Sequence, residues 1–275
     1  MKQRYAKALR VTRDKLLLDV GGTFIKCSDG REIPIDSAGS RESIVSSLHA
    51  AVGDAAKVAV AIPGPFDYQN GIFLMKHKFA AVYGESFAQV AGRSGGEFRF
   101  IHDVNCMLLG ALQDPSLKQY GRIALVTLGT GLGFAYAVNG RIQCNEMGSP
   151  AVPLWNRPCG DGIVEDYASK RGAMKAWCDV TGKPWPEGMS VKDIVTTDEG
   201  SAAFALMGER LGKAAAPLLN ELSIDCVLFG GQISKSFFLM ERTLRQSLSS
   251  VPSLRFVGPL PDLDHATFNG LRSLK

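Results

Sequence analysis

Two distant segments of the chain follow the same plan. Residues 16–33 read LLLDVGGTFIKCSDGREI, and residues 123–142 read IALVTLGTGLGFAYAVNGRI. Each is an apolar run, a turn of glycine and threonine, a second run, a tight turn and a third run. The tight turns, Asp29-Gly30 and Asn139-Gly140, are typical of β-hairpins, because such short connections need residues that tolerate a positive φ. Two copies of one β-meander, each opening half of the chain, predict a duplicated two-lobe architecture.

The rest of the sequence alternates between expected strands and expected helices. Further strands are expected at residues 58–62, 98–102 and 226–229. Helices are expected at residues 41–52, 86–91, 104–113, 162–178, 201–222, 236–250 and 265–274. The turn-rich segment 180–188 is expected to be a loop between helices. Strands mixed with helices of this length indicate an α/β protein with layered sheets.

Composition limits the class of protein. The 275 residues are 45% hydrophobic and 21% charged, which excludes wholesale disorder and fits one large domain or two ordinary ones. The formal net charge of +4 is too small to predict nucleic-acid binding. The longest uncharged stretch, residues 123–140, contains glycines and threonines, which favour two strands around a turn over a membrane helix. A soluble protein is expected.

Cysteine usage and the first residues bear on the compartment. None of the six cysteines forms a C-x-x-C pair, and most stand among apolar residues, as buried free thiols do. The basic residues near the start are followed only by the short apolar run 16–20, which is too short for a signal peptide. A reduced, cytoplasmic location is therefore expected.

The first glycine turn, residues 21–23, belongs to the motif DVGGT that begins at Asp19 and ends the first apolar run. Glycines let the backbone approach a phosphate closely, and consecutive amide groups make an anion-binding concavity. Asp19 could hold Mg²⁺, through water. The alternative is an ordinary hairpin turn.

The second glycine turn, residues 129–133, reads GTGLG. It is not a dinucleotide fingerprint, because Phe134 stands where G-x-G-x-x-G needs its last glycine and a strand, not a helix, follows. A second phosphate-binding hairpin fits better. Two such turns at corresponding places support one another, since a triphosphate between two lobes needs a contact from each side.

Asp103 lies where an expected strand, 98–102, passes into an expected helix. One interpretation is a helix N-cap, which aspartate favours. The other is a general base that the helix N-terminus keeps ionised. Two further junctions are similarly open: residues 62–67 form a plain Pro/Gly turn or a ligand loop, and Gly230-Gly231 mark a close strand–helix crossing or a platform for the nucleoside of a nucleotide.

Other catalytic motifs are not supported. Residues 92–96 match the serine-hydrolase pattern G-x-S-x-G, but a helix is expected before them and a strand after, the reverse of that elbow. There is no Walker A or H-E-x-x-H motif. The four histidines show no metal-ligand spacing. His77 could reach a sugar site, although a solvated basic loop is the simpler interpretation.

Taken together, the motifs resemble those of the ROK family of sugar kinases, in the actin-like ATPase superfamily. The matching pieces occur in the family's order: DVGGT at 19–23, IPGPFD at 62–67, DVN at 103–105, LGTGLG at 128–133, EMG at 146–148, CG at 159–160 with EDYAS at 165–169, and FGGQIS at 229–234. The resemblance implies a two-lobed α/β fold, of the duplicated ribonuclease H-like kind, with a cleft between lobes. It implies lobes of residues 1–104 with 262–275, and of residues 105–261.

The resemblance also implies roles for individual residues. Asp103 would be the general base that takes the proton of a sugar hydroxyl, usually the 6-hydroxyl, which attacks the γ-phosphate of ATP. The phosphates and Mg²⁺ would be bound by Asp19, Gly21, Gly22, Thr23, Gly129, Thr130, Gly131 and Gly133, and the adenosine by Gly230 and Gly231. The sugar would be bound by Gly64, His102, Asp103, Glu146, Ser149 and Glu165.

The sequence departs from the family pattern in the sugar and zinc regions. His102 stands where the family usually has asparagine, and Ser149 replaces the histidine of Glu-x-Gly-His. The family's zinc run C-x-C-G-x-x-G-C keeps only Cys159, with Arg157 and Val164 at the positions of the first and last cysteines. A structural zinc site needs four ligands, so no structural zinc is expected. Transfer from ATP is thus better supported than any named sugar.

The expected function is ATP-dependent phosphorylation of a hexose or hexose derivative, as in a glucokinase. The alternative is a non-catalytic sugar-binding or regulatory protein on the same fold. A DNA-binding repressor is not expected, because only about fifteen residues precede the first strand, too few for a helix-turn-helix. The expected partners are a sugar and ATP, without nucleic acid or membrane, and a homodimer is left open.

Overall fold

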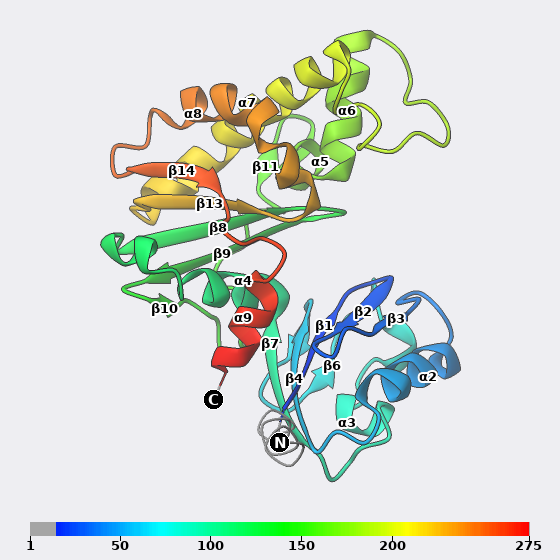
Figure 1. The fold of residues 1–275 in the computed structure, drawn as a ribbon. Helices are drawn as coiled ribbons and strands as arrows, with labels where there is room; N and C mark the ends of the chain where they lie inside the picture. The colour runs from blue at the N-terminus through cyan, green and yellow to red at the C-terminus, as the bar shows by residue number, and fades with distance from the viewer. Residues whose placement is uncertain (1–14, 275) are drawn as a thin grey trace, which may run out of the picture. The chain divides into compact units, whose positions relative to one another are not determined.

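The computed structural model describes residues 15–274, which fold into two compact units (Figure 1). Of the described residues, unit 1 comprises 15–113, 144–149 and 264–274, and unit 2 comprises Asp114–Gln143 and Pro150–Leu263. The basic residues within positions 1–14 lie outside the described residues. No helix within residues 15–274 is both long enough and apolar enough to cross a bilayer.

Unit 1 is built on a five-stranded sheet with the order β3-β2-β1-β4-β7. Its strands are β1 (Leu16–Val20), β2 (Phe24–Cys27), β3 (Glu32–Pro34), β4 (Lys57–Ile62) and β7 (Glu97–His102). The first three form the antiparallel meander, and β4 and β7 continue the sheet in parallel with β1. Because β1 and β4 are central, their apolar side chains are almost fully buried.

Short elements and helices complete unit 1. They are α2 (Arg41–Val52), β5 (Phe66–Asp67), β6 (Ile72–Phe73), η1 (Ala80–Val82), α3 (Phe87–Val90), α4 (Asp103–Ala111) and α9 (Ala266–Ser273). Helix α9, red in Figure 1, lies along α4. Glycines allow this approach, since a Cβ at Gly110 would be 1.8 Å from the carbonyl oxygen of Ala266 and one at Gly270 would be 2.0 Å from that of Cys106. This contact fixes α4, whose first residue is Asp103.

Unit 2 repeats the same sheet plan in the order β10-β9-β8-β13-β14. Its strands are β8 (Arg122–Leu128), β9 (Leu132–Val138), β10 (Arg141–Ile142), β13 (Cys226–Gly230) and β14 (Phe256–Pro259). Again the first three form an antiparallel meander, and the last two run parallel to β8. The expected duplication of an α/β unit is therefore confirmed.

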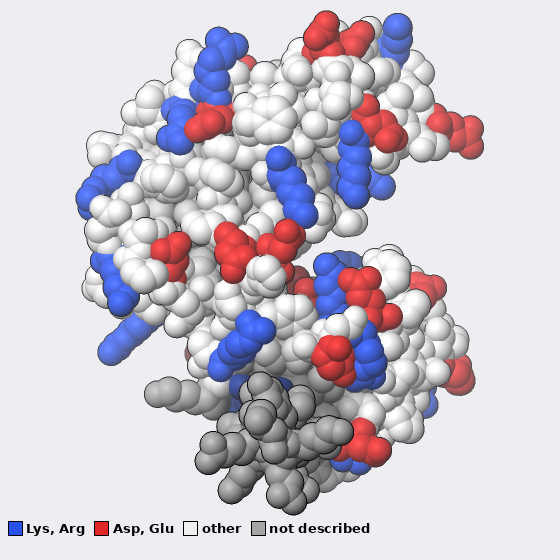
Figure 2. Space-filling model, in the orientation of Figure 1, with Lys and Arg blue, Asp and Glu red and all other residues white. Residues whose placement is uncertain are grey.

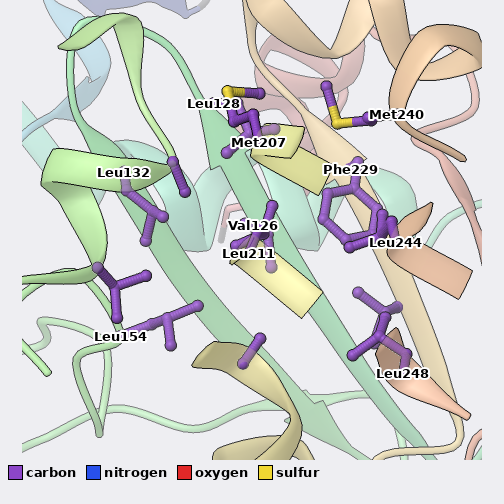
Figure 3. Packing of buried hydrophobic residues seen from close by; sticks show 14 of the residues in the cluster. Val126, Leu128, Leu132, Leu154, Met207, Leu211, Phe229, Met240, Leu244 and Leu248 are labelled. Carbon is purple, nitrogen blue, oxygen red and sulfur yellow. The ribbon is translucent and has the colours of Figure 1, made fainter. Parts of the chain in front are cut away.

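The other elements of unit 2 include the helices that pack against its sheet. They are η2 (Pro115–Gln119), β11 (Pro158–Cys159), β12 (Gly162–Ile163), α5 (Val164–Tyr167), α6 (Lys170–Thr181), α7 (Asp198–Glu221), η3 (Gln232–Ser236) and α8 (Phe237–Leu248). Figure 3 shows the core, in which Val126 and Phe229 of the sheet lie among Leu211 of α7 and Leu244 of α8. This core supports the strands on either side of the second glycine turn.

Some expectations about the elements were wrong. The single helix expected at 162–178 is a short strand and two helices, because Ser169 caps a new helix by accepting from the Arg171 amide. Strands β5, β6 and β14 were not foreseen. Helix α4 begins at Asp103 and has His102 as its N-cap. The segment 144–149 and α4, which the expected division gave to the second lobe, pack in unit 1, and the lobe boundaries stay predictions.

Candidate functional site

The first glycine turn joins β1 to β2 and is tightly held. The Gly21 amide donates to the Phe24 carbonyl at 2.9 Å, and a Cβ at Gly21 would be 3.0 Å from that oxygen. The carbonyl of Gly22 accepts from the Ser37 amide at 3.1 Å, and that of Thr23 from Ile35 at 2.9 Å. Carbonyl oxygens that would repel a phosphate are thus committed to protein partners, which suits an anion-binding turn.

Asp19 lies one residue before this turn on β1. Burial, together with the negative charge of Asp103, raises the pKa of the Asp19 carboxyl to about 6, against a smaller opposing effect of Lys26. Among residues 15–274 no group hydrogen-bonds to this carboxylate, and no three His, Cys, Asp or Glu side chains gather as a metal site. A lone, uncompensated carboxylate fits Mg²⁺, which is usually held by one or two carboxylates plus substrate phosphates.

Asp103 is the first residue of α4, at the end of β7, and its side chain is 43% exposed. Burial alone would raise its pKa, but the charge and hydrogen bond of His102, the Val104 amide and the charge of Lys78 outweigh it. The net effect holds the pKa of the Asp103 carboxyl below its usual range. The group is therefore an ionised carboxylate that can accept a proton.

Candidate sugar-binding residues of unit 1 lie beside Asp103. A Cβ at Gly64 would be 3.4 Å from Cδ2 of His102 and 3.2 Å from the hydroxyl of Tyr68. Tyr68 is buried, donates to the Ile62 carbonyl at 3.0 Å and lies with its ring 5.8 Å from that of His102. The structure thus brings Gly64 and His102 together, and adds Tyr68, which the sequence analysis did not single out.

The segment Cys144–Ser149 carries Glu146 and Ser149 into unit 1. Its turn is organised by Asn145, whose Oδ1 accepts from the amides of Met147 and Ser149, each at 3.0 Å. The buried Asn105 of α4 donates to the Gly148 carbonyl at 3.2 Å. Asn105, two residues after Asp103, therefore ties this segment to the first turn of α4. The role of Asn105 in holding this segment is visible from this tertiary contact and not from the sequence.

In unit 2 the second glycine turn is held by hydrogen bonds to the segment 165–170. The Gly129 amide donates to the Gly131 carbonyl at 3.0 Å, and the Gly129 carbonyl accepts from the Lys170 amide at 2.8 Å. The Leu132 amide donates to Oε2 of Glu165 at 2.9 Å, and a Cβ at Gly131 would be 2.7 Å from that oxygen. A side chain at position 131 would therefore have to displace the Glu165 carboxylate from the turn.

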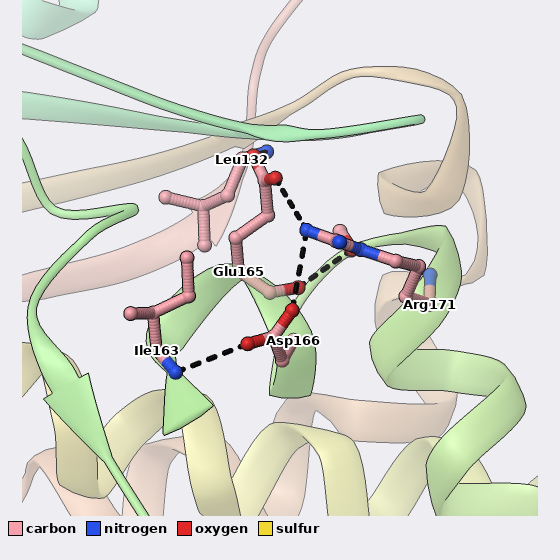
Figure 4. A network of polar contacts seen from close by, with 6 residues as sticks. Leu132, Ile163, Glu165, Asp166 and Arg171 are labelled. Atoms are coloured by element: carbon pink, nitrogen blue, oxygen red, sulfur yellow. Dashed lines mark hydrogen bonds and ion pairs between the residues drawn. The ribbon is translucent and has the colours of Figure 1, made fainter.

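Glu165 belongs to a network of charged groups under the second glycine turn (Figure 4). Its Oε1 accepts from Nη2 of Arg171 at 2.7 Å, and the same nitrogen lies 3.2 Å from Oδ1 of Asp166. Asp166 in turn accepts from the Ile163 amide at 3.1 Å. Glu165, expected to bind sugar, has both oxygens engaged by protein groups here, and Arg171 is a neighbour of the turn that sequence reasoning missed.

Gly230 and Gly231 end β13. Gly231 has a positive φ of 83°, and a Cβ there would be 2.4 Å from the carbonyl oxygen of Leu128. The close crossing considered in the sequence analysis is therefore present, directly behind the second glycine turn. The adenosine-binding role of the pair stays a prediction.

The region of the family's zinc run contains little metal-binding chemistry. Cys159 lies in β11, and Arg157 is 3.6 Å from Glu221 in an ion pair. Val164 is fully buried, and Ser149 belongs to the other unit. The absence of structural zinc stays a prediction.

On the face drawn in Figure 2, basic and acidic side chains are intermixed over the described residues.

The two α/β lobes, each with a five-stranded sheet, have the actin-like ATPase fold. The sequence profile of the ROK family matches residues 40–256, and the chain belongs to this family. The resemblance seen in the motifs is thereby confirmed.

Known sugar kinases match most of the chain. An N-acetyl-D-glucosamine kinase of Haemophilus influenzae is 21% identical over 93% of this chain and 96% of its own. A glucokinase of Thermotoga maritima is 23% identical over 90% of this chain and 82% of its own. The structure of a ROK family glucokinase from Streptomyces griseus, in complex with glucose and AMPPNP, matches with a TM-score of 0.75 at 18% identity, over 94% of this chain and 97% of that one.

Proposed function

We propose that the protein transfers the γ-phosphoryl group of ATP to the 6-hydroxyl of a hexose or hexose derivative. The observation that carries the proposal is the Asp103 carboxylate at the junction of β7 and α4. It is accessible, its pKa is held below the usual range, and it interacts electrostatically with Asp19 beside the first glycine turn. An accessible, ionised carboxylate at this place is a group that can accept the proton of a sugar hydroxyl.

In the proposed reaction, Asp103 accepts the hydroxyl proton as the sugar oxygen forms a bond to the γ-phosphorus. The bond between that phosphorus and the bridging oxygen breaks, and its electron pair leaves with ADP. Asp19 would hold Mg²⁺, which neutralises phosphate charge when bound. In each unit, amides of the glycine turn that are not bonded to a protein acceptor would contribute to phosphate binding, so that catalysis consists mainly of positioning and charge neutralisation.

The sugar subsite includes His102, Glu146 and Ser149, with Gly64 and Tyr68 as its wall. Carboxylate and imidazole groups suit sugar hydroxyls, because they accept or donate hydrogen bonds directionally. Ser149 is shorter than the histidine of the family pattern, which leaves room for a larger substituent. Relatives named for glucose and for N-acetylglucosamine make hexoses and N-acetylhexosamines the substrates to compare.

A coupled assay of ADP release tests this function. Wild-type protein with ATP and Mg²⁺ is compared across hexoses, amino sugars and N-acetylhexosamines, with a sugar-free control. ADP release that depends on one of these sugars, with a 6-phosphate as product, is expected. Sugar binding without ADP release for every sugar would favour the non-catalytic sugar-binding alternative.

A further inference from the structure

The segment after β6 carries three basic residues, Lys76, His77 and Lys78, which differ in their surroundings. Lys76 and His77 are exposed, and the Lys76 ammonium lies 5.4 Å above the Tyr83 ring. Lys78 is half-buried. Among residues 15–274 no carboxylate lies within ion-pair distance of its ammonium. Lys78 is therefore a partly desolvated cation without a bonded counter-ion.

The backbone beside Lys78 is fixed to the first glycine turn. The Phe79 amide donates to the Ser37 carbonyl at 2.6 Å, and the Ser37 amide donates to the Gly22 carbonyl at 3.1 Å. Phe79 has a left-handed conformation, with φ 52° and ψ 25°, which costs free energy in a residue with a bulky side chain. Its fully buried ring, 5.5 Å from that of Phe73, offsets this cost.

The Lys78 side chain extends to the turn itself. Its Cε lies 3.9 Å from the position that a Cβ would take at Gly22. Its charge also acts on the Asp103 carboxylate, where it favours the ionised form. The ammonium is thus within electrostatic reach of both the turn expected to bind phosphate and the candidate base.

The geometry points to Lys78 as a further catalytic residue that contacts the γ-phosphoryl group during transfer, an inference that rests on the proposed function. Charge on the equatorial oxygens of this group must be stabilised as the bond to ADP breaks and the bond to the sugar oxygen forms. Lys78 moves no proton in this step, since Asp103 takes the hydroxyl proton and the electron pair leaves with ADP. A single cation fixed at this place stabilises the transition state more than the ground state.

The test compares Lys78→Met with Lys76→Met, a matched control in the same segment, and with Lys78→Arg. We expect Lys78→Met to lower kcat about a hundredfold while the Kd of the sugar stays unchanged. Lys78→Arg should recover part of the activity, and Lys76→Met should match the wild type. Circular dichroism and thermal unfolding verify that each variant is folded.

Calorimetric titration with AMPPNP and with ADP supplies a readout that does not depend on turnover. Lys78→Met should weaken AMPPNP binding about tenfold more than ADP binding, because only the former carries a γ-phosphoryl group. If the wild type phosphorylates no sugar, the proposed function fails. The titration still shows whether Lys78 contacts the γ-phosphoryl group, because it does not depend on turnover. Equal effects on AMPPNP and ADP, or a Lys78→Met variant indistinguishable from Lys76→Met, would overturn the inference.

Discussion

The imidazole Nδ1 of His102 lies 2.9 Å from Oδ1 of Asp103. The Val104 amide nitrogen is 2.7 Å from the same carboxylate oxygen and 3.3 Å from Nδ1. Because the amide has the nearer and charged acceptor in Asp103, Nδ1 is free to carry the proton that it donates to the carboxylate. Nε2, on the side of Gly64, then has no part in this contact and is the atom of His102 that we propose for the sugar.

The first prediction concerns this pair. His102→Ala removes the hydrogen bond that orients the candidate base, so kcat should fall about tenfold or more. His102→Asn restores the residue of the family pattern and a side-chain donor, and should retain more activity than His102→Ala. Steady-state kcat and KM for the sugar check this. Equal kcat in wild type and His102→Ala would contradict it.

The second prediction concerns the stability of the nucleotide-free protein. Desolvation and the nearby charge of Asp103 raise the pKa of the half-buried Asp19 to about 6, so the folded state binds this proton more tightly than the unfolded state. Stability is therefore lost as pH rises from about 4 to about 6, and the cost is fully present above that range. Asp19→Asn removes the cost, and its stability relative to wild type should rise by about 2 kcal/mol between pH 4.5 and pH 8.

Urea unfolding in the presence of a chelator measures this difference. Asp54→Asn, which changes a fully exposed carboxylate of the same unit, is the control and should show no comparable trend. A difference between Asp19→Asn and wild type that does not change with pH would count against the burial of a charged Asp19.

The third prediction concerns the second glycine turn. Arg171→Met leaves the charge of Glu165 uncompensated 2.9 Å from the Leu132 amide, close to where phosphate is expected. KM for ATP should then rise about tenfold, with a smaller change in KM for the sugar. Glu165→Gln in the Arg171→Met background removes this charge and should recover part of the loss.

Lys175→Met, one turn further along α6, is the matched control, since the Lys175 ammonium approaches the exposed Asp161 and the Tyr167 ring and not Glu165. It should leave KM for ATP unchanged. A rise in KM for the sugar alone would instead assign Glu165 and Arg171 to the sugar site.

The fourth prediction is that folding needs no zinc. Cys159 is the one ligand of the family's zinc pattern that this sequence keeps, and the other cysteines and the histidine are replaced. Pro150, Pro153 and Leu154 can hold the loop by packing instead. Metal analysis of chelator-treated protein should find no stoichiometric zinc, and the Tm should not change on treatment. Bound zinc at one per chain, or unfolding on its removal, would refute this.

Local sequence signals predicted much of the fold. The meanders were recognisable because apolar runs are separated by glycine turns and by D-G and N-G turns. The helix expected at 41–52 is α2, which Ser40 caps at its start and Gly53 follows at its end. The break before α6 was missed, since it depends on the Ser169 hydroxyl donating to the Glu165 carbonyl and on Gly172, where a Cβ would be 2.2 Å from the carbonyl carbon of Tyr167. Such contacts are visible only in the folded chain.

The candidate site shows the same limit. Asp103 and the glycine turns could be predicted, because a carboxylate at a strand–helix junction and glycines after an apolar strand are local patterns. The place of Lys78 could not, since a lysine in a basic loop carries no signal until the Phe79 amide is bonded to Ser37. The DVN pattern includes Asn105, but it does not reveal the hydrogen bond from Asn105 to the Gly148 carbonyl.

The most direct test of the central claim is the turnover of Asp103→Asn with the sugar that gives the highest wild-type rate. Asparagine keeps the shape of the side chain but cannot accept the hydroxyl proton. We expect kcat to fall by about two to four orders of magnitude, while calorimetry shows unchanged binding of sugar and AMPPNP. A folded Asp103→Asn variant that keeps more than about a tenth of wild-type turnover would show that Asp103 is not the general base.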